Sequence, residues 1–529
     1  MNLVKPDSVT TTGSITRSTT GTYIDSAGVM QTAAINAVRI NHDPATKEFL
    51  GVLIENASTN LILYSEQVDN AAWTKLSGAT VTANTAVAPN GTTTADTLTI
   101  SQTKQIYASP VSATAGTYCF SAFFKSTGSS SAYLQLNLDY GGSANVAAVD
   151  INFNSKTLSV RFGTPLEYSI TEYPNGWLRV ALSLTGTSSS TLVGYIVSPS
   201  SVDGTVYFWG AQVESGSKPT SYIPTVASQV TRAADIITGS GLVYTTLTES
   251  NPEWSSATTY ALGAKVVYGI YGTYQSLQSG NLNHTPPITS PFTDAYWVRT
   301  GPTNKMAMFD DQISSVSSGT NDIIFAVVAS SIDSVALLNI TASKTNIAVT
   351  DKDTKVLAYH NSQQLSGGES LDWYGYFFYD ADTQKTSSIY LDIPPAANSL
   401  ITIKVSGTGT VSVGTYVNGQ IKSLGGTQYG VSAGIIDYSR KETDEFGNTT
   451  FTKRNFSKRM NASVSLTNSN LNRVQRILYD LRATPVLWIA STDAQFEEPL
   501  IIYGFYRDFS TEISYPTHSI CNLQVEGLI

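Results

Sequence analysis

Residues 133–140, with the sequence YLQLNLDY, alternate polar and apolar side chains along the whole stretch. Because successive side chains of a β-strand point to opposite faces of its sheet, this alternation predicts a strand with one buried face. The leucines of the stretch are expected in a core. The opposite face is expected to present Tyr133, Gln135, Asn137 and Asp139.

The flanking sequence predicts more strands of the same kind. Residues 117–125, TYCFSAFFK, form a second alternating stretch, and residues 176–180, GWLRV, mark a corner. The turn-forming sequences Pro89-Asn90-Gly91 and Gly141-Gly142 separate such stretches. Short strands bounded by turn signals are typical of antiparallel sandwiches. We therefore expect an antiparallel β domain over residues 60–225.

The two ends of this domain are its most distinctive parts. It opens with NLILYSE at residues 60–66 and closes with FWGAQVE at 208–214 and SYIPT at 221–225. With these ends, the block resembles the carbohydrate-binding-module-like jelly rolls of bacteriophage tail and spike proteins. Residues 15–25 and 41–44 resemble the leader that often precedes that domain. The resemblance implies a virion adhesion protein, such as a tail fibre or spike. The polar face of residues 133–140 then makes Tyr133, Gln135, Asn137 and Asp139 candidate glycan-binding residues, and an ordinary solvent-facing sheet is the alternative.

Composition limits the classes of partner. Charged residues make up 13% of the chain, against about 25% in an average soluble protein. The net charge is −9 and no long basic run occurs, so we expect no nucleic-acid binding. The N-terminus lacks the apolar core of a signal peptide, and the longest apolar run, 323–329, is too short to insert into a membrane. Cys119 is expected as a buried free thiol.

A chain of 529 residues is too long for one core, so about three to five domains are expected. The fold class that we predict is mainly β and multidomain. The expected segments are an N-terminal leader (1–59), the jelly roll (60–225), a connector (226–250), a small module (251–300), a β-sandwich (301–436) and an α+β domain (437–529).

The small module has a regular spacing of aromatic residues. Trp254, Tyr260, Tyr274 and Trp297 surround the sequence Gly263-Ala264-Lys265-Val266. This pattern resembles the three-stranded chitin-binding modules of chitinases. The resemblance makes Tyr274 a candidate glycan-binding residue. The adjacent aromatics that those modules place after the second strand are replaced here by Ser276-Leu277-Gln278-Ser279, so a structural spacer is the alternative.

Residues 301–529 are expected to contain short strands and one helix. The predicted strands of the sandwich are 323–329, 334–340, 371–379, 388–393 and 400–405. In the last domain, residues 435–443 and 449–460 are predicted as polar strands, and 486–491, 500–509 and 519–526 as further strands. The helix is predicted at 468–482, capped by Asn468 or Asn470, with an apolar stripe of Leu471, Val474, Leu478 and Leu481.

The sequence favours a protein without an active site. The four histidines fall in separate segments, so no zinc motif is formed. Gly430-Val431-Ser432-Ala433-Gly434 matches a nucleophile-elbow string, but a strand is expected after it where an elbow needs a helix. We expect no cofactor. Structural calcium at Asp351-Lys352-Asp353 or Asp380-Ala381-Asp382 would use oxygen ligands, but neither site has an EF-hand motif.

These observations and the resemblance together predict a non-enzymatic phage tail or baseplate protein that adsorbs to a host-surface glycan. The expected partners are other tail or baseplate proteins, a bacterial surface glycan, and further copies of the chain as a homo-oligomer or as multiple copies per virion. The protein is expected to be made in the host cytoplasm and located in the virion, and the C-terminal domain is a possible anchor. A purely structural baseplate protein and a glycan depolymerase remain alternatives. The depolymerase is weakened by the absence of a β-helix repeat.

Overall fold

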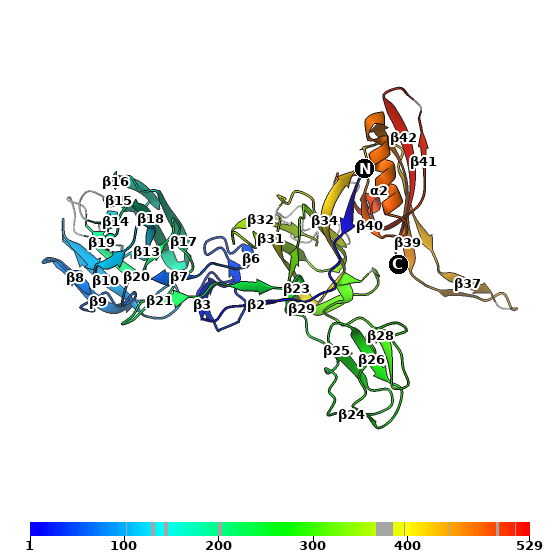
Figure 1. The fold of residues 1–529 in the computed structure, drawn as a ribbon, viewed down its shortest axis with the longest axis horizontal. Helices are drawn as coiled ribbons and strands as arrows, with labels where there is room; N and C mark the ends of the chain where they lie inside the picture. The colour runs from blue at the N-terminus through cyan, green and yellow to red at the C-terminus, as the bar shows by residue number, and fades with distance from the viewer. Residues whose placement is uncertain are drawn as a thin grey trace. The chain divides into compact units, whose positions relative to one another are not determined.

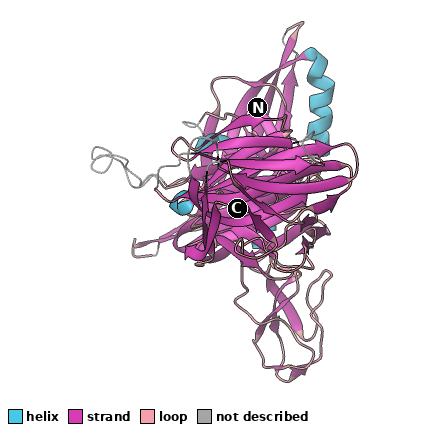
Figure 2. Ribbon diagram, turned by 90° about the vertical axis from the view of Figure 1, so that its left-hand side faces the viewer, coloured by secondary structure: helices cyan, strands magenta, loops and turns pink. Residues whose placement is uncertain are grey.

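The computed structural model confirms the predicted fold class. It is mainly β, with 56% of residues in strands and 5% in helices (Figure 2). The chain divides into two compact units, a first unit of residues 15–237 and a second unit of residues 1–14 and 238–529. The described residues are 1–101, 103–128, 133–141, 146–198, 204–310, 312–366, 384–395, 397–443, 445–493, 497–513 and 515–528.

The first unit contains two antiparallel sheets. One sheet has the strand order β17-β18-β13-β20-β10-β9. Its strands are β9 (Ala79–Ala86), β10 (Ala95–Ile100), β13 (Gly116–Ser126), β17 (Glu167–Tyr173), β18 (Trp177–Gly186) and β20 (Gly204–Ser215). A one-turn 3-10 helix, Pro174–Gly176, connects β17 to β18.

The other sheet, which we call the tyrosine sheet, has the order β16-β15-β14-β19-β11-β8, and β12 also pairs with β19 (Figure 1). Its strands are β8 (Trp73–Lys75), β11 (Gln105–Ala108), β12 (Val111–Ala113), β14 (Tyr133–Tyr140), β15 (Val146–Asn152), β16 (Thr157–Phe162) and β19 (Ser190–Val197).

The two sheets enclose one apolar core. Leu134, Leu136 and Leu138 of β14 are fully buried in it, as their alternation predicts, and they share it with Phe120 and other residues of the opposite sheet. Gly194 of β19 faces the same core. A Cβ atom there would lie 2.8 Å from the Phe120 ring, closer than packed carbon atoms approach. The sandwich therefore packs tightly at this point only because residue 194 is glycine.

Short pairs of strands precede and follow the sandwich. The pairs are β3 (Gly21–Ile24) with β4 (Met30–Ala33), β5 (Ile40–His42) with β6 (Phe49–Val52), β7 (Ser58–Asn60) with β21 (Val230–Arg232), and β2 (Ser14–Thr16) with β22 (Ile236–Thr238). Asn60 is fully buried, and its amide donates to the carbonyls of Ala211 and Ile223 while accepting from the N–H groups of Ile62 and Val213. This one side chain joins the start of the domain to its end.

The second unit is built on a 14-stranded sheet, whose longest path is β23-β29-β34-β1-β40-β41-β42-β39-β35. Its strands are β1 (Asn2–Pro6), β23 (Gly241–Thr245), β29 (Ser317–Ala329), β30 (Ser334–Thr341), β31 (Lys344–Asp351), β32 (Leu357–Gln364), β33 (Ser387–Tyr390), β34 (Ser399–Ser423), β35 (Gly426–Thr427), β36 (Ser432–Asp437), β39 (Phe456–Thr467), β40 (Val486–Ile489), β41 (Ile501–Glu512) and β42 (His518–Gly527). Four of the five strands predicted in the sandwich are confirmed, and the fifth, 371–379, lies outside the described residues.

The N-terminal strand, β1, lies between β34 and β40 and so joins the strands on either side of it into one sheet. β1 pairs with β34 on one side and with β40 on the other. The expected leader of residues 1–59 is thus divided, since residues 1–14 belong to the second unit and the rest to the first. The segments expected as a β-sandwich and a C-terminal domain share one hydrogen-bonded sheet through this strand.

A one-turn helix, α3 (Glu497–Leu500), and a 3-10 turn, Ala307–Phe309, occur in the second unit. The predicted helix is confirmed as α2 (Leu471–Asp480), which follows a 3-10 turn at Asn468–Asn470. The apolar stripe of α2 is buried as expected at Val474, Leu478 and Leu481. The predicted cap is wrong, because neither asparagine side chain bonds to the helix N–H groups. Asn470 donates to Thr467 Oγ1, and Asn468 donates to the Tyr515 carbonyl. No helix in the described part of the chain is long and apolar enough to cross a membrane.

The small module is a separate cluster of strands within the second unit. β25 (Lys265–Tyr268), β26 (Gly272–Ser276) and β28 (Trp297–Gly301) form its three-stranded sheet, and β24 (Thr259–Tyr260) pairs with β27 (Asn281–Leu282). Tyr260 and Trp297 lie in its core, while Trp254 is only half-buried against it. The Trp297 indole N–H donates to the His284 carbonyl at 2.7 Å.

Replacing Trp297 by Ala should cost the module about 3–5 kcal/mol, as truncation of a buried aromatic does. Hydrogen exchange of residues 259–301 in the full chain measures this loss of protection. Tyr271→Ala is the matched control, because Tyr271 is an exposed aromatic of the same module. Unchanged exchange in Trp297→Ala would show that the ring does not support this core.

Candidate functional site

The outer face of the tyrosine sheet gathers the candidate binding residues. The pairing register of the strands places five side chains in one row across this face. Tyr107 of β11 lies opposite Tyr195 of β19, and Tyr195 lies opposite Asn137 of β14. Thr74 extends the row at one end and Ala148 at the other. All five side chains point away from the core, since their strand neighbours Ile106, Leu136, Leu138, Ala147, Val149 and Ile196 lie in it.

Two tyrosines form the aromatic part of this row. The ring centroids of Tyr107 and Tyr195 lie 5.2 Å apart, with the ring planes inclined at 45°. Both rings are only partly buried. Burial raises the pKa of the Tyr195 hydroxyl, and the nearby charge of Asp139 raises it further. Tyr195 therefore stays a neutral hydrogen-bond donor at physiological pH.

Amide and carboxylate groups lie next to the tyrosines. Asn137 is 8% exposed, and its Oδ1 has no hydrogen-bond donor among the described residues. In the neighbouring row, Gln135 lies opposite Asp150. The Oδ2 atom of Asp150 lies 3.7 Å from Arg161, and the Oδ1 atom of Asp150 also has no described donor. A buried acceptor without a donor costs about 1–3 kcal/mol. Both oxygens are themselves buried, so the partly exposed rings of Tyr107 and Tyr195 are the groups of this row that face a ligand first.

The structure brings together three of the predicted site residues. Gln135, Asn137 and Asp139 lie on one face of β14, as the alternation predicts, although Gln135 and Asn137 are more buried than a solvent-facing strand implies. The Tyr133 side chain lies outside the described part. Tyr274 is in the small module and is fully buried, with its hydroxyl donating to the Pro287 carbonyl at 2.6 Å. No ring face of Tyr274 is open to a sugar, because the residue is part of the core of its module.

Sequence reasoning missed Tyr107 and Tyr195. Each alternates with core residues, Tyr107 between Ile106 and Ala108 and Tyr195 before Ile196. That pattern could have assigned both to an outer face. Only the pairing of β11 with β19 and of β19 with β14 places them beside Asn137. The register of strands far apart in the sequence was not available from local patterns.

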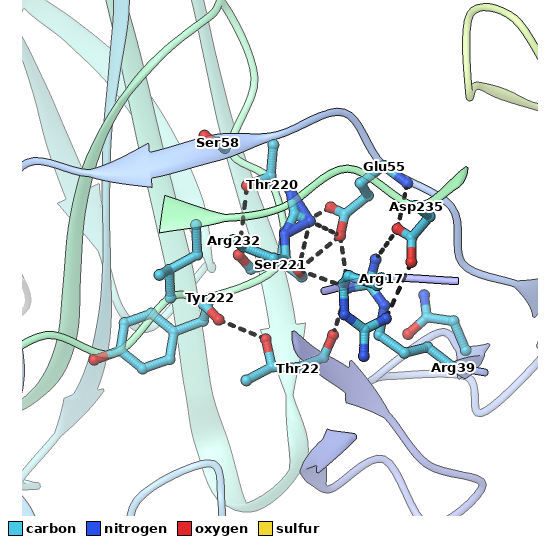
Figure 3. Close-up of polar contacts among 12 residues, drawn as sticks. Arg17, Thr22, Arg39, Glu55, Ser58, Thr220, Ser221, Tyr222, Arg232 and Asp235 are labelled. Carbon is cyan, nitrogen blue, oxygen red and sulfur yellow. Dashed lines mark hydrogen bonds and ion pairs between the residues drawn. The ribbon is translucent and has the colours of Figure 1, made fainter. Parts of the chain in front are cut away.

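A second polar cluster of the first unit is buried and made of ion pairs (Figure 3). The Asp235 carboxylate accepts from Arg17 at 3.0 Å and from Arg39 at 2.6 Å. Glu55 accepts from Arg39 at 2.7 Å and from Arg232 at 2.5 Å. The three arginines and Asp235 are each at most 3% exposed. We call these five residues the ionic cluster.

The ionic cluster joins segments that are distant in the sequence. Arg17, Arg39 and Glu55 precede the sandwich, whereas Arg232 and Asp235 follow it. Ser221 adds its N–H and hydroxyl to Glu55, and the Glu55 N–H donates to Asp235 (Figure 3). Each arginine of the cluster pairs with at least one of the two carboxylates, so the cluster is suited to holding these segments together.

Other candidate sites lack the required geometry. Ser432 of the elbow-like string begins β36, so a strand follows it as expected. Asp351 accepts from the N–H groups of Asp353 and Thr354 within a turn, which lowers its pKa without any metal. Asp380 and Asp382 lie outside the described residues. Within the described ranges, no group of three His, Cys, Asp or Glu residues could hold a metal ion.

The cysteines have a structural environment. Cys119 and Cys521 are both buried free thiols, which confirms the expectation for Cys119. Burial raises the pKa of Cys119 to about 12, so it stays protonated and unreactive at neutral pH.

Comparison with protein-family models and with curated proteins finds no match to this chain.

The ionic cluster should make the first unit sensitive to acid. Burial alone raises the pKa of Glu55, but Arg232, Arg39 and the bonds from Ser221 outweigh it, so the pKa lies below its ordinary value. A lowered folded-state pKa contributes stability above the ordinary value of about 4.3 and loses it as the pH falls through the folded pKa. Glu55→Gln should destabilise the unit by about 3–5 kcal/mol at pH 7.

Hydrogen exchange of residues 15–60, measured in the full chain from pH 7 to acid, checks this. The difference between wild type and Glu55→Gln should shrink on acidification. The exposed Glu48→Gln is the control and should leave the exchange unchanged at each pH. A difference that stays constant down to acid pH would show that Glu55 does not act as a charge.

Proposed function

We propose that this chain is a non-enzymatic glycan-binding protein and that the outer face of the tyrosine sheet binds the sugar. The observation that supports this most is the partly exposed Tyr107–Tyr195 pair, which lies in one row with Asn137. Aromatic rings and a side-chain amide in one row match the two sides of a sugar.

The chemistry of sugars explains the match. A pyranose ring has an apolar C–H face that packs on an aromatic ring, and a rim of hydroxyls that donate and accept hydrogen bonds. Tyr107 and Tyr195 supply the ring surface and keep their hydroxyls as donors. Asp139 and Asp150, which are partly exposed on the neighbouring strands, supply carboxylate acceptors. Because these groups come from four adjacent strands, their spacing is fixed by the sheet and needs little ordering on binding.

The setting that we propose is adsorption of a phage tail or baseplate to a bacterial surface glycan. It is supported by the resemblance of residues 60–225 to the jelly-roll domains of phage tail and spike proteins. In that setting the partners of the chain are other tail or baseplate proteins, and the protein is located in the virion. A mainly β, multidomain fold is compatible with such a particle.

Tyr195→Ala should weaken glycan binding by about tenfold or more, because loss of one aromatic contact of about 1.4 kcal/mol corresponds to tenfold in affinity. Tyr107→Ala and Asn137→Ala should also weaken it. The measurement is a glycan array with the full chain, followed by titration calorimetry on the best glycan. Tyr168→Ala is the matched control, since Tyr168 is an exposed tyrosine on β17 of the other sheet.

The array also separates the competing functions. No binding to any bacterial surface glycan would favour a purely structural baseplate role. Release of reducing sugars from host polysaccharide would favour a depolymerase. Binding that survives Tyr195→Ala and Tyr107→Ala together would place the site elsewhere on the chain.

A further inference from the structure

A hairpin of the second unit extends beyond its sheet. β37 (Arg440–Thr443) and β38 (Thr449–Thr452) pair with each other and with no other strand of the described chain. They continue from the end of the β36–β39 pair, and Figure 1 shows them projecting from it. Every residue of β37 and β38 is exposed. We call residues 437–456 the arm.

The arm exposes aromatic side chains that soluble proteins usually bury. Phe446 at its tip is 89% exposed and Phe451 is 73% exposed. Tyr438 and Phe456 at its root are exposed as well. An isolated two-stranded hairpin is at best marginally stable in water. Exposed aromatic residues gathered on such an element mark an interaction surface.

A cavity opens at the root of the arm. Its volume is about 460 Å³, and Phe456, Leu338, Ile501 and Tyr503 give it apolar walls. Lys458 and Glu498 form a 2.9 Å ion pair that also lines it. A cavity of about 150 Å³ already holds benzene. The root therefore has room for an aromatic side chain.

Charge is divided along the arm. Its outer half carries Glu442 and Glu445, its root carries Lys453 and Arg454, with Arg459 just beyond, and Arg440 and Lys441 lie between, Arg440 paired with Glu442 at 2.8 Å. The acidic end and the basic end are thus separated along one hairpin. Two arms side by side in the same direction would place like charges together, whereas two arms in opposite directions would pair acidic with basic.

We infer that the arm docks on the arm of a second copy of this chain, antiparallel and around a two-fold axis. The acidic outer half of each arm lies against the basic root of the other. Because both arms have the same length, Phe446 of each copy reaches the root cavity of its partner. The open edges of the two hairpins add backbone hydrogen bonds between the copies. Such an interface is isologous and closes with two copies.

Analytical ultracentrifugation of the full chain at low salt tests the association. The wild type should be a dimer. Phe446→Ser with Phe451→Ser should give a monomer with an unchanged circular dichroism spectrum, because both side chains are exposed. The control is Tyr429→Ser, a fully exposed tyrosine outside the arm, which should leave the dimer intact.

A charge exchange tests the antiparallel arrangement. One variant carries Glu442→Lys and Glu445→Lys, so its arm is predominantly basic. The other carries Lys453→Glu and Arg454→Glu, so its arm is predominantly acidic. Each variant alone should dimerise at least tenfold more weakly than wild type. An equal mixture should restore dimers that contain one chain of each kind.

Three results would overturn the inference. A wild type that remains monomeric at micromolar concentration shows that the arm does not self-associate. A dimer that persists after both phenylalanines are replaced uses another surface. A trimer, or a mixture of charge variants that stays monomeric, excludes the two-fold antiparallel pairing.

Discussion

The first unit depends on the two carboxylates of the ionic cluster, Asp235 and Glu55. Both belong to segments with short strands and little apolar surface of their own, yet they hold three buried arginines in place. Taking charges out of water is costly, and removing one partner of a buried pair leaves the other uncompensated. The cluster consequently fixes where the chain enters and leaves the sandwich. Asn60 repeats this role with neutral hydrogen bonds.

The sequence predicted those parts of the fold that local patterns determine. The alternation in residues 133–140 correctly assigned three leucines to the core and placed Gln135, Asn137 and Asp139 on the opposite face. The spacing of Leu471, Val474, Leu478 and Leu481 identified α2. In these cases side-chain periodicity and burial act within one element, so no information on distant residues is needed.

The parts that depend on distant pairing were not predictable. Nothing in residues 2–6 indicates that they pair with β34 and β40, more than 400 positions later. Tyr107 and Tyr195 become one surface only through the register of β11 and β19. Asn468 fails as a cap for a related reason, because its Oδ1, the acceptor that a cap needs, accepts instead from the Ser519 hydroxyl of β42.

The proposed binding face and the proposed arm contact address one physical difficulty. A single sheet face makes few contacts with a sugar. The entropic cost of ordering the ligand and the side chains offsets part of the binding free energy that these contacts provide. In that proposal, joining two faces in one dimer would make the second contact with a repetitive surface intramolecular, which multiplies affinity without any new contact in the site. Tyr107, Tyr195 and Asn137 then need only modest individual strength. The aromatic residues of the arm, exposed in a single chain, are covered when two chains form that dimer.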